Sequence, residues 1–197
     1  MGREFELKYR ADAEKIAAIR EQYGDFTSIS METTYYDTPG HALGDLHWTL
    51  RRRMENGRSV CTVKTPQKGS ARGEWETECD SIKAAIPVLC KLGAPEILPR
   101  ILEDGLIRSC GARFTRLAKL LVLEACTVEL ALDQGVLLGG KWEEPLAEVE
   151  VELKSGSEAA AVEFAKGLAV RFGLVPEPKS KVQRALELAV KPETNRR

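Results

Sequence analysis

Residues 4–10 of the chain read EFELKYR, a stretch in which charged and apolar side chains alternate. Two glutamates, a lysine and an arginine fall on one face of an extended strand, whereas a phenylalanine, a leucine and a tyrosine fall on the other. Such alternation predicts a strand with one buried face. Whether the charged face meets water or a ligand depends on what the other strands carry.

The same alternation recurs along the chain. It predicts strands over residues 3–10, 31–37, 47–54, 59–65, 72–79, 112–122, 126–133 and 146–153. Short turn-forming sequences mark their ends, namely Glu55-Asn56-Gly57, Lys68-Gly69-Ser70, Asp133-Gln134-Gly135 and Gly139-Gly140. Because such short connections join antiparallel neighbours, we expect an antiparallel sheet or barrel.

Amphipathic segments predict helices among these strands. They cover residues 13–23, 82–92, 158–172 and 181–190, and the residues before them, Asp12, Ser81, Ser157 and Ser180, are good helix caps. Segment 95–104 predicts a short helix or turn. Since the composition never shifts as it does at a linker, we expect one domain over residues 1–190 and a mobile tail over 191–197.

Three of the predicted strands carry mainly carboxylates on their charged faces, and at least one carries mainly guanidinium groups. The basic positions are Arg51, Arg53 and Lys64, and the acidic ones are Glu74, Glu76, Glu78, Glu129, Asp133, Glu148, Glu150 and Glu152. Like charges on neighbouring positions repel, so a merely solvated face usually mixes the signs. If helices cover the apolar sides and the sheet closes, the charged sides form a hydrophilic tunnel. An open sheet with a solvated charged face is the alternative.

The charged residue types point to a class of ligand. Paired carboxylates are hard oxygen ligands suited to Mg²⁺ or Mn²⁺. Clusters of arginine and lysine suit phosphate oxygens. Both sets in one cavity predict a metal-bound polyphosphate.

Composition excludes several other classes of function. With 29 basic and 30 acidic residues, the net charge of −1 argues against a general nucleic-acid binder. There is no apolar run near ~20 residues, so we expect no membrane span. Five scattered cysteines without a CxxC pair predict reduced thiols and a cytoplasmic protein. The oligomeric state stays open, with a homodimer as one alternative.

Taken in order, the motifs resemble those of the CYTH, or triphosphate tunnel metalloenzyme, family. EFELK is similar to the family's ExExK signature, TLRRR to its arginine-rich strand, TVK to its lysine strand and RGEWE to its R-x-E-x-E strand. ELALDQG, LAEVEVELKSG and the late KSK…R resemble the remaining elements, most of all those of bacterial inorganic triphosphatases. The resemblance spans residues 3–184.

The resemblance implies an α+β fold, an eight-stranded antiparallel barrel with helices packed on its outside. It also implies roles for particular residues. The metal ligands would be Glu4, Glu6, Glu148 and Glu150, and the phosphate-binding residues would be Lys8, Arg51, Arg53, Lys64, Arg116 and Lys181. The catalytic residues would be Glu4, Glu6, Lys8 and Glu76. Glu74 and Asp133 would support these residues.

Two of these placements have local rivals. Arg113 and Lys119 flank Arg116, which matches the family pattern best, and Lys179 lies two residues from Lys181.

The expected activity is metal-dependent hydrolysis of inorganic triphosphate to pyrophosphate and phosphate. Three alternatives remain: a nucleotide or thiamine triphosphatase, a class IV adenylyl cyclase, and a polyphosphate-binding module without turnover. All of them use the same charged cradle, so the sequence alone does not separate them.

Overall fold

The computed structural model describes residues 5–66 and 72–191. Its strands are β1 (Glu6–Arg10), β2 (Thr27–Asp37), β3 (Thr49–Glu55), β4 (Arg58–Pro66), β5 (Arg72–Glu78), β6 (Ile107–Val122), β7 (Cys126–Gly139), β8 (Trp142–Gly156) and β9 (Val175–Pro176). Its helices are α1 (Ala13–Tyr23), α2 (Ala42–Asp45), α3 (Ile82–Lys91), α4 (Leu98–Ile101), α5 (Glu158–Phe172) and α6 (Lys181–Ala189). The turn expected at 68–70 and residues 192–197 of the tail expected over 191–197 lie outside the described residues.

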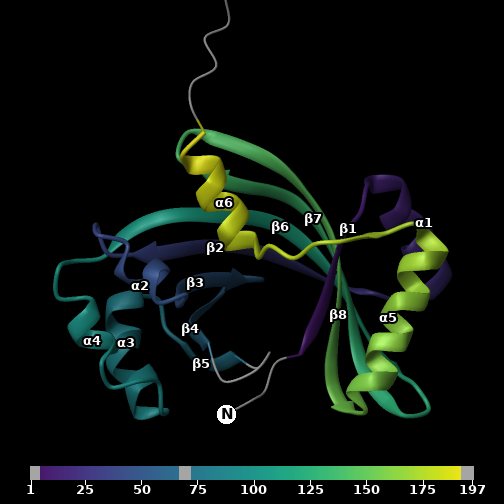
Figure 1. Cartoon of the computed structure of the whole chain (residues 1–197), viewed down its shortest axis with the longest axis horizontal. Helices are drawn as coiled ribbons and strands as arrows, with labels where there is room; N and C mark the ends of the chain where they lie inside the picture. The colour runs from purple at the N-terminus through teal and green to yellow at the C-terminus, as the bar shows by residue number, and fades with distance from the viewer. Residues whose placement is uncertain (1–4, 67–71, 192–197) are drawn as a thin grey trace, which may run out of the picture.

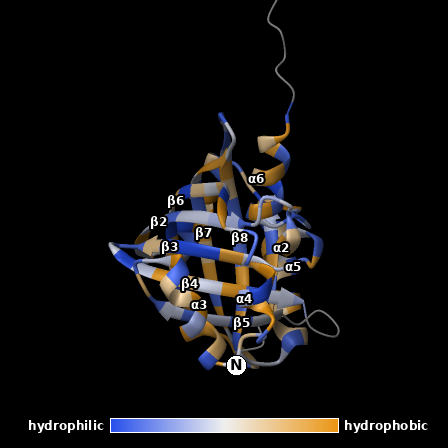
Figure 2. Cartoon of the chain, turned by 90° about the vertical axis from the view of Figure 1, so that its left-hand side faces the viewer, coloured by the Kyte–Doolittle hydropathy of each residue, from blue (hydrophilic) through white to orange (hydrophobic). Residues whose placement is uncertain are grey.

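The strands form one antiparallel sheet in the order β5-β4-β3-β2-β6-β7-β8-β1-β9. The sheet curls strongly, so that β3 to β5 lie opposite β8 and β1 (Figure 1). Figure 2 shows β2 to β5 stacked, with β7 and β8 crossing behind them. Within the described residues the sheet has nine strands, and its two edge strands, β5 and β9, do not pair with each other. The expected closed eight-stranded barrel is therefore not confirmed.

Two helical layers cover the convex face of the sheet, as the alternation predicts. On one side α3 and α4 pack over β3 to β5, where Leu50, Val63 and Trp75 are buried. On the other side α1 and α5 pack over β1, β7 and β8, where Val149 and Val151 are buried. Since side chains alternate along a strand, this burial turns the neighbouring charged positions toward the concave face.

The four capping residues expected from the sequence cap α1, α3, α5 and α6. The side chains of Asp12, Ser81, Ser157 and Ser180 each accept a backbone N–H from the first turn of the helix that follows. Ser180 and Gln183 form a reciprocal capping box, which fixes the start of α6.

One helix departs from the expected arrangement, because α6 packs on the concave face. Ala185 and Leu188 contact Leu137 and Leu146 there, and the latter two share their strand faces with the charged positions of β7 and β8. The expectation that all helices lie outside is therefore wrong for α6. This helix closes one end of the curled sheet instead.

The strands β2, β6, β7 and β8 run further than their alternation indicates. Asp133-Gln134-Gly135, expected as a turn, lies inside β7. A Cβ at Gly135 would stand 2.2 Å from the carbonyl oxygen of Arg113, so this glycine permits two backbones to approach closely. The other two turns are confirmed: Asn56 and Gly57, both with positive φ, join β3 to β4, and Gly140 helps join β7 to β8.

In the described part of the chain, the helices are too short or too polar to cross a lipid bilayer.

Candidate active site: a charged cavity inside the curled sheet

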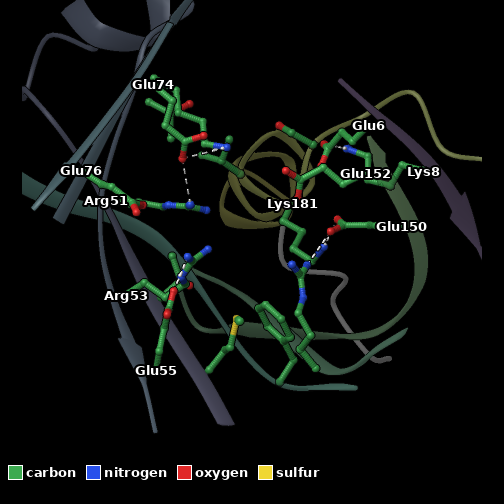
Figure 3. Close-up of a pocket in the computed structure, with 18 of the residues that line it drawn as sticks. Glu6, Lys8, Arg51, Arg53, Glu55, Glu74, Glu76, Glu150, Glu152 and Lys181 are labelled. Carbon is green, nitrogen blue, oxygen red and sulfur yellow. Dashed lines mark hydrogen bonds and ion pairs between the residues drawn. The ribbon is translucent and has the colours of Figure 1, made fainter. Parts of the chain in front are cut away.

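The curled sheet and the first turn of α6 enclose a cavity of about 560 Å³. Among the described residues, seven carboxylates and seven basic side chains line it, and the charged residues labelled in Figure 3 lie on two facing walls. The acidic residues are Glu6, Glu55, Glu74, Glu76, Glu129, Glu150 and Glu152, and the basic ones are Lys8, Arg51, Arg53, Lys64, Arg116, Lys154 and Lys181. Because the signs balance, the cavity suits a ligand that combines an anion with cations.

The first wall consists of β3, β4 and β5. Lys64 and Glu74 are direct neighbours across β4 and β5, and Glu74 Oε1 lies 3.3 Å from Lys64 Nζ and 3.6 Å from Arg51 Nη2. Arg53 pairs with Glu55. The Nε atoms of Arg51 and Arg53 are buried, and no hydrogen-bond acceptor meets them in the described part of the chain. These N–H groups can donate to an incoming anion.

The opposite wall consists of β1, β8 and β7. Glu6 pairs in register with Glu152, and Glu152 pairs with Glu129, so three carboxylates stand in one row across three strands. Lys154 Nζ lies 2.8 Å from Glu152 and 3.7 Å from Glu129, and Lys8 Nζ lies 4.0 Å from Glu6. We call Glu6, Glu129 and Glu152 the acidic row.

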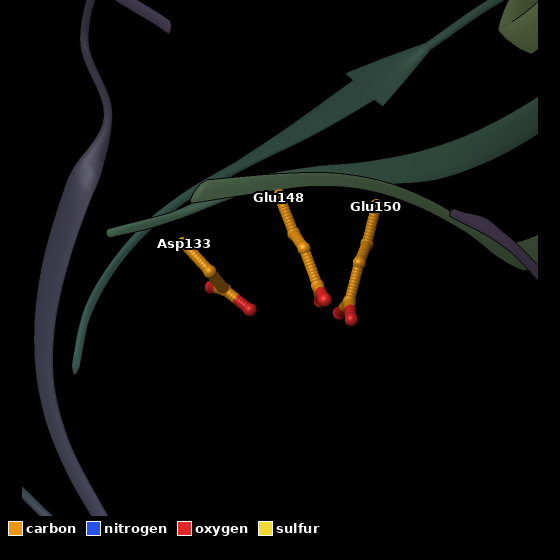
Figure 4. Close-up of side chains that lie close together, drawn as sticks. All are labelled: Asp133, Glu148 and Glu150. Carbon is orange, nitrogen blue, oxygen red and sulfur yellow. The ribbon is translucent and has the colours of Figure 1, made fainter. Parts of the chain in front are cut away.

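Deeper in this wall lies a buried ionic cluster. Asp133, Glu148 and Glu150 each place an oxygen within 4.8 Å of the others, a spacing that could hold a metal ion (Figure 4). Lys181 Nζ already stands 2.9, 2.5 and 2.6 Å from these three carboxylates. Arg116 makes a two-pronged contact with Asp133 at 2.8 and 2.7 Å. A metal ion here would have to displace the Lys181 ammonium.

The pKa values follow from this cluster. Burial works against the charge of Lys181, but the three surrounding carboxylates outweigh it and hold the pKa of Lys181 well above its usual value. Burial likewise opposes the charge of Glu150, yet Lys181 and Arg116 lower its pKa. The cluster is therefore a unit in which the charges of its basic side chains and carboxylates compensate one another.

On the first wall, burial and then Arg51 lower the pKa of Arg53.

Most residues expected at the site line the cavity. These are Glu6, Lys8, Arg51, Arg53, Lys64, Glu74, Glu76, Arg116, Glu150 and Lys181. Glu4 lies outside the described residues. Asp133 and Glu148 are fully buried behind the wall, and Glu148 contacts Lys181 and Arg184 Nη1, the latter at 2.5 Å.

The neighbouring basic residues Arg113, Lys119 and Lys179, which the sequence offered as alternatives, do not line the cavity. Arg113 is exposed and contacts Glu143, and the Lys119 ammonium donates to the carbonyl oxygens of Tyr23 and Gly24. Lys179 is exposed and pairs with Glu187. The structure thus brings Arg116 and Lys181, and not these neighbours, to the cavity.

Sequence reasoning assigned no site role to four of the charged lining residues, namely Glu55, Glu129, Glu152 and Lys154. The sequence placed Glu129 and Glu152 on the charged faces of their predicted strands, but the resemblance gave them no function. Glu55 lies two positions after Arg53, and Lys154 lies two positions after Glu152. Side chains two positions apart in a strand point to the same face, so extending each of these strands by two residues would have predicted both Glu55 and Lys154 on the charged face.

Comparison with known proteins identifies the family. Residues 2–186 match the CYTH domain model, so the chain belongs to the CYTH domain family. It is 26% identical over 198 residues to the inorganic triphosphatase of Haemophilus influenzae, a match that covers 97% of this chain and 56% of that protein. The chain thus spans about half the length of this curated relative.

Solved structures share the fold at low identity. A Hippeastrum protein described as a candidate adenylyl cyclase with a dominant triphosphatase activity aligns with a TM-score of 0.67 and 17% identity, covering 96% of this chain and 98% of that one. A candidate adenylate cyclase of Bacillus halodurans aligns with a TM-score of 0.64 and 18% identity, covering 93% and 98%. At these identities the likeness concerns the fold alone.

Proposed function

We propose that this CYTH protein hydrolyses inorganic triphosphate to pyrophosphate and phosphate with the help of Mg²⁺ or Mn²⁺. One observation carries the proposal: a wall with two buried arginine N–H donors that lack an acceptor in the described residues faces a wall with a row of three carboxylates. The first wall fits phosphate oxygens and the second fits cations. The relationship to an inorganic triphosphatase supports the choice of substrate.

The donor set of the cavity fits a divalent cation of the hard, oxygen-preferring kind. We propose Glu4, Glu6 and Glu150 as ligands, as the motif implies, together with Glu152, which neighbours Glu6 in the register. Glu148 fits less well, because its carboxylate is fully buried on Lys181 and Arg184. When bound, the ion would neutralise phosphate charge and polarise the scissile phosphoanhydride bond.

The basic residues bind and orient the substrate in this proposal. Arg51 and Arg53 donate to phosphate oxygens, and Lys64 and Lys8 add ammonium groups from two strands. Charge on the transferred phosphoryl group and on the leaving pyrophosphate is thereby stabilised by groups already in place. Because these side chains are held by neighbouring carboxylates, little reorganisation accompanies binding.

The attacking water needs a base, and Glu76 is our candidate. It lines the cavity from the edge strand β5, two residues from Glu74, which holds Arg51 and Lys64. We propose that Glu76 orients the water and takes its proton on a carboxylate oxygen. A cyclase would instead need to deprotonate a ribose hydroxyl and hold an adenine.

A panel of substrates separates the alternatives. Triphosphate, ATP and thiamine triphosphate would each be incubated with the protein and Mg²⁺ or Mn²⁺, and the products resolved by ion chromatography. We expect phosphate and pyrophosphate from inorganic triphosphate at the highest kcat/KM. Preferred turnover of an organic triphosphate, cyclic AMP from ATP, or unchanged ligands throughout would each contradict the proposal and identify a rival.

The setting of the protein is part of the same proposal. All five cysteines are free thiols, which supports a cytoplasmic location. The balanced net charge supports a small polyphosphate, rather than nucleic acid or a membrane surface, as the partner. We further propose a single domain over residues 1–190; a homodimer stays an alternative to a monomer.

A further inference from the structure

Lys154 occupies a special position in β8. Thr127 pairs with Ser155 and Val128 pairs with Leu153, so the register shifts and Lys154 is the extra residue of a β-bulge. Bulges re-aim a side chain, and they are common beside active sites. Here the bulge accompanies a lysine that lines the cavity.

The ammonium of Lys154 compensates part of the acidic row. Glu6, Glu152 and Glu129 are direct neighbours across β1, β8 and β7, an arrangement in which like charges repel. Lys154 Nζ lies 2.8 Å from Glu152 and 3.7 Å from Glu129, and its side chain is 36% exposed. A partly exposed ammonium on a flexible four-carbon stem can leave this position without disturbing the sheet.

We infer that Lys154 is an internal counter-ion, which a divalent cation displaces from Glu129 and Glu152. This inference rests on the proposed function, because it concerns the same cavity. The ammonium and the metal ion compete for the same oxygens, so Lys154 weakens the binding of metal alone. Once displaced, the ammonium is close enough to the cavity to contact the polyphosphate. Lys154 thereby favours the joint binding of metal and anion over binding of the metal by itself.

The test measures binding of Mn²⁺ alone by titration calorimetry, with no substrate present. Lys154→Met should bind Mn²⁺ roughly two- to fivefold more tightly than wild type, the range expected when a partly exposed ion pair is removed. Lys154→Arg should stay near wild type, because the charge is kept. Lys15→Met is the matched control: Lys15 also has a side-chain exposure of 36% and pairs with a carboxylate, but lies outside the cavity.

Each outcome decides the matter. Tighter Mn²⁺ binding by Lys154→Met and not by Lys15→Met supports the inference, even where wild type binds no measurable Mn²⁺. Unchanged or weaker binding by Lys154→Met, an equal gain in both variants, or no binding by either protein overturns it. Triphosphate hydrolysis by wild type is assayed separately, so failure of the inference is distinguished from failure of the proposed function.

Discussion

Lys181 and Arg51 both line the cavity as cations, but their surroundings differ. Lys181 contacts three buried carboxylates and its side chain is only 9% exposed. Arg51 has one carboxylate at 3.6 Å and a buried Nε without an acceptor in the described chain. The first residue is already satisfied within the protein, whereas the second retains a donor for a ligand. Their replacement should therefore affect different properties.

Lys181→Met should destabilise the fold by about 3–5 kcal/mol, because it leaves buried carboxylates without their shared partner. Arg51→Ala should change stability little and weaken triphosphate binding by about 1.5–3 kcal/mol, the value of a charge-assisted hydrogen bond. Urea unfolding and calorimetry with triphosphate measure the two effects. Equal unfolding midpoints for the two variants would contradict this division of roles.

Glu6→Gln should lower metal affinity while the apo protein keeps or gains stability, because it relieves repulsion in the acidic row. Phe5→Ser, one residue away, should instead lower stability first, since the apolar side of this segment faces the helices. Mn²⁺ titration and thermal unfolding test the pair. Unchanged Mn²⁺ affinity in Glu6→Gln would mean that Glu6 does not bind metal and that this face of the strand is only solvated.

At the scale of elements, the position of α6 decides the shape of the cavity. The backbone of α6 lies directly on β7: a Cβ at Gly139 would stand 2.2 Å from the carbonyl oxygen of Ala185 and 2.6 Å from the amide nitrogen of Ala189. The ion pairs of Lys181 and Arg184 then join the helix to β8. Close packing and charge together hold this helix on the concave face.

Gly139→Ala should push α6 away from the sheet and cost about 1–3 kcal/mol, as overpacking does. The matched control is Gly167→Ala in α5, where a new Cβ meets nothing within 4 Å and helix propensity favours alanine. Thermal unfolding should therefore move in opposite directions for the two variants. A stable Gly139→Ala protein would mean that α6 is not tightly seated.

The contact between α6 and β8 also makes stability depend on pH. The pKa of Glu150 is lowered in the folded protein, whereas an unfolded glutamate titrates near ~4.3. The unfolded chain thus takes up this proton first as the pH falls, and the stability contributed by Glu150 is present above ~5 and lost below it. In metal-free buffer, the free energy of unfolding of Glu150→Gln should fall less steeply with acid than that of wild type.

The control for this slope is Glu163→Gln, which removes an exposed carboxylate of α5. Its acid dependence should match that of wild type. If the slope of Glu150→Gln also matches wild type, then Glu150 does not link the cluster to acid stability.

At the scale of the whole molecule, the sequence predicted the apolar face of the sheet and most of the cavity wall. Alternation placed Arg51 and Glu150 on charged faces beside the apolar Leu50, Val149 and Val151, and the structure buries these three neighbours. Alternation could not predict the location of α6, since a helix with an apolar stripe fits either face of a sheet. It also could not show that Lys181 and Arg184 of α6 would pair with Asp133 and Glu148, because these partners lie more than 30 positions away in the chain.

The register of the sheet explains how strands that carry charges of one sign can lie side by side. Several strands carry mainly one sign, and at some positions the register pairs opposite signs across neighbouring strands, as in the pairs Lys64 with Glu74 and Arg116 with Asp133. The cavity is therefore balanced before any ligand binds. Such a site should prefer a polyphosphate that arrives with its metal ions over the bare anion.

The central claim is tested most directly by following inorganic triphosphate with ³¹P nuclear magnetic resonance, in the presence of the protein and Mg²⁺, with and without excess EDTA. The account predicts that the triphosphate signals are replaced by equal amounts of phosphate and pyrophosphate, and that EDTA stops this conversion. Triphosphate that persists with Mg²⁺ present, or conversion that continues undiminished in EDTA, would contradict it.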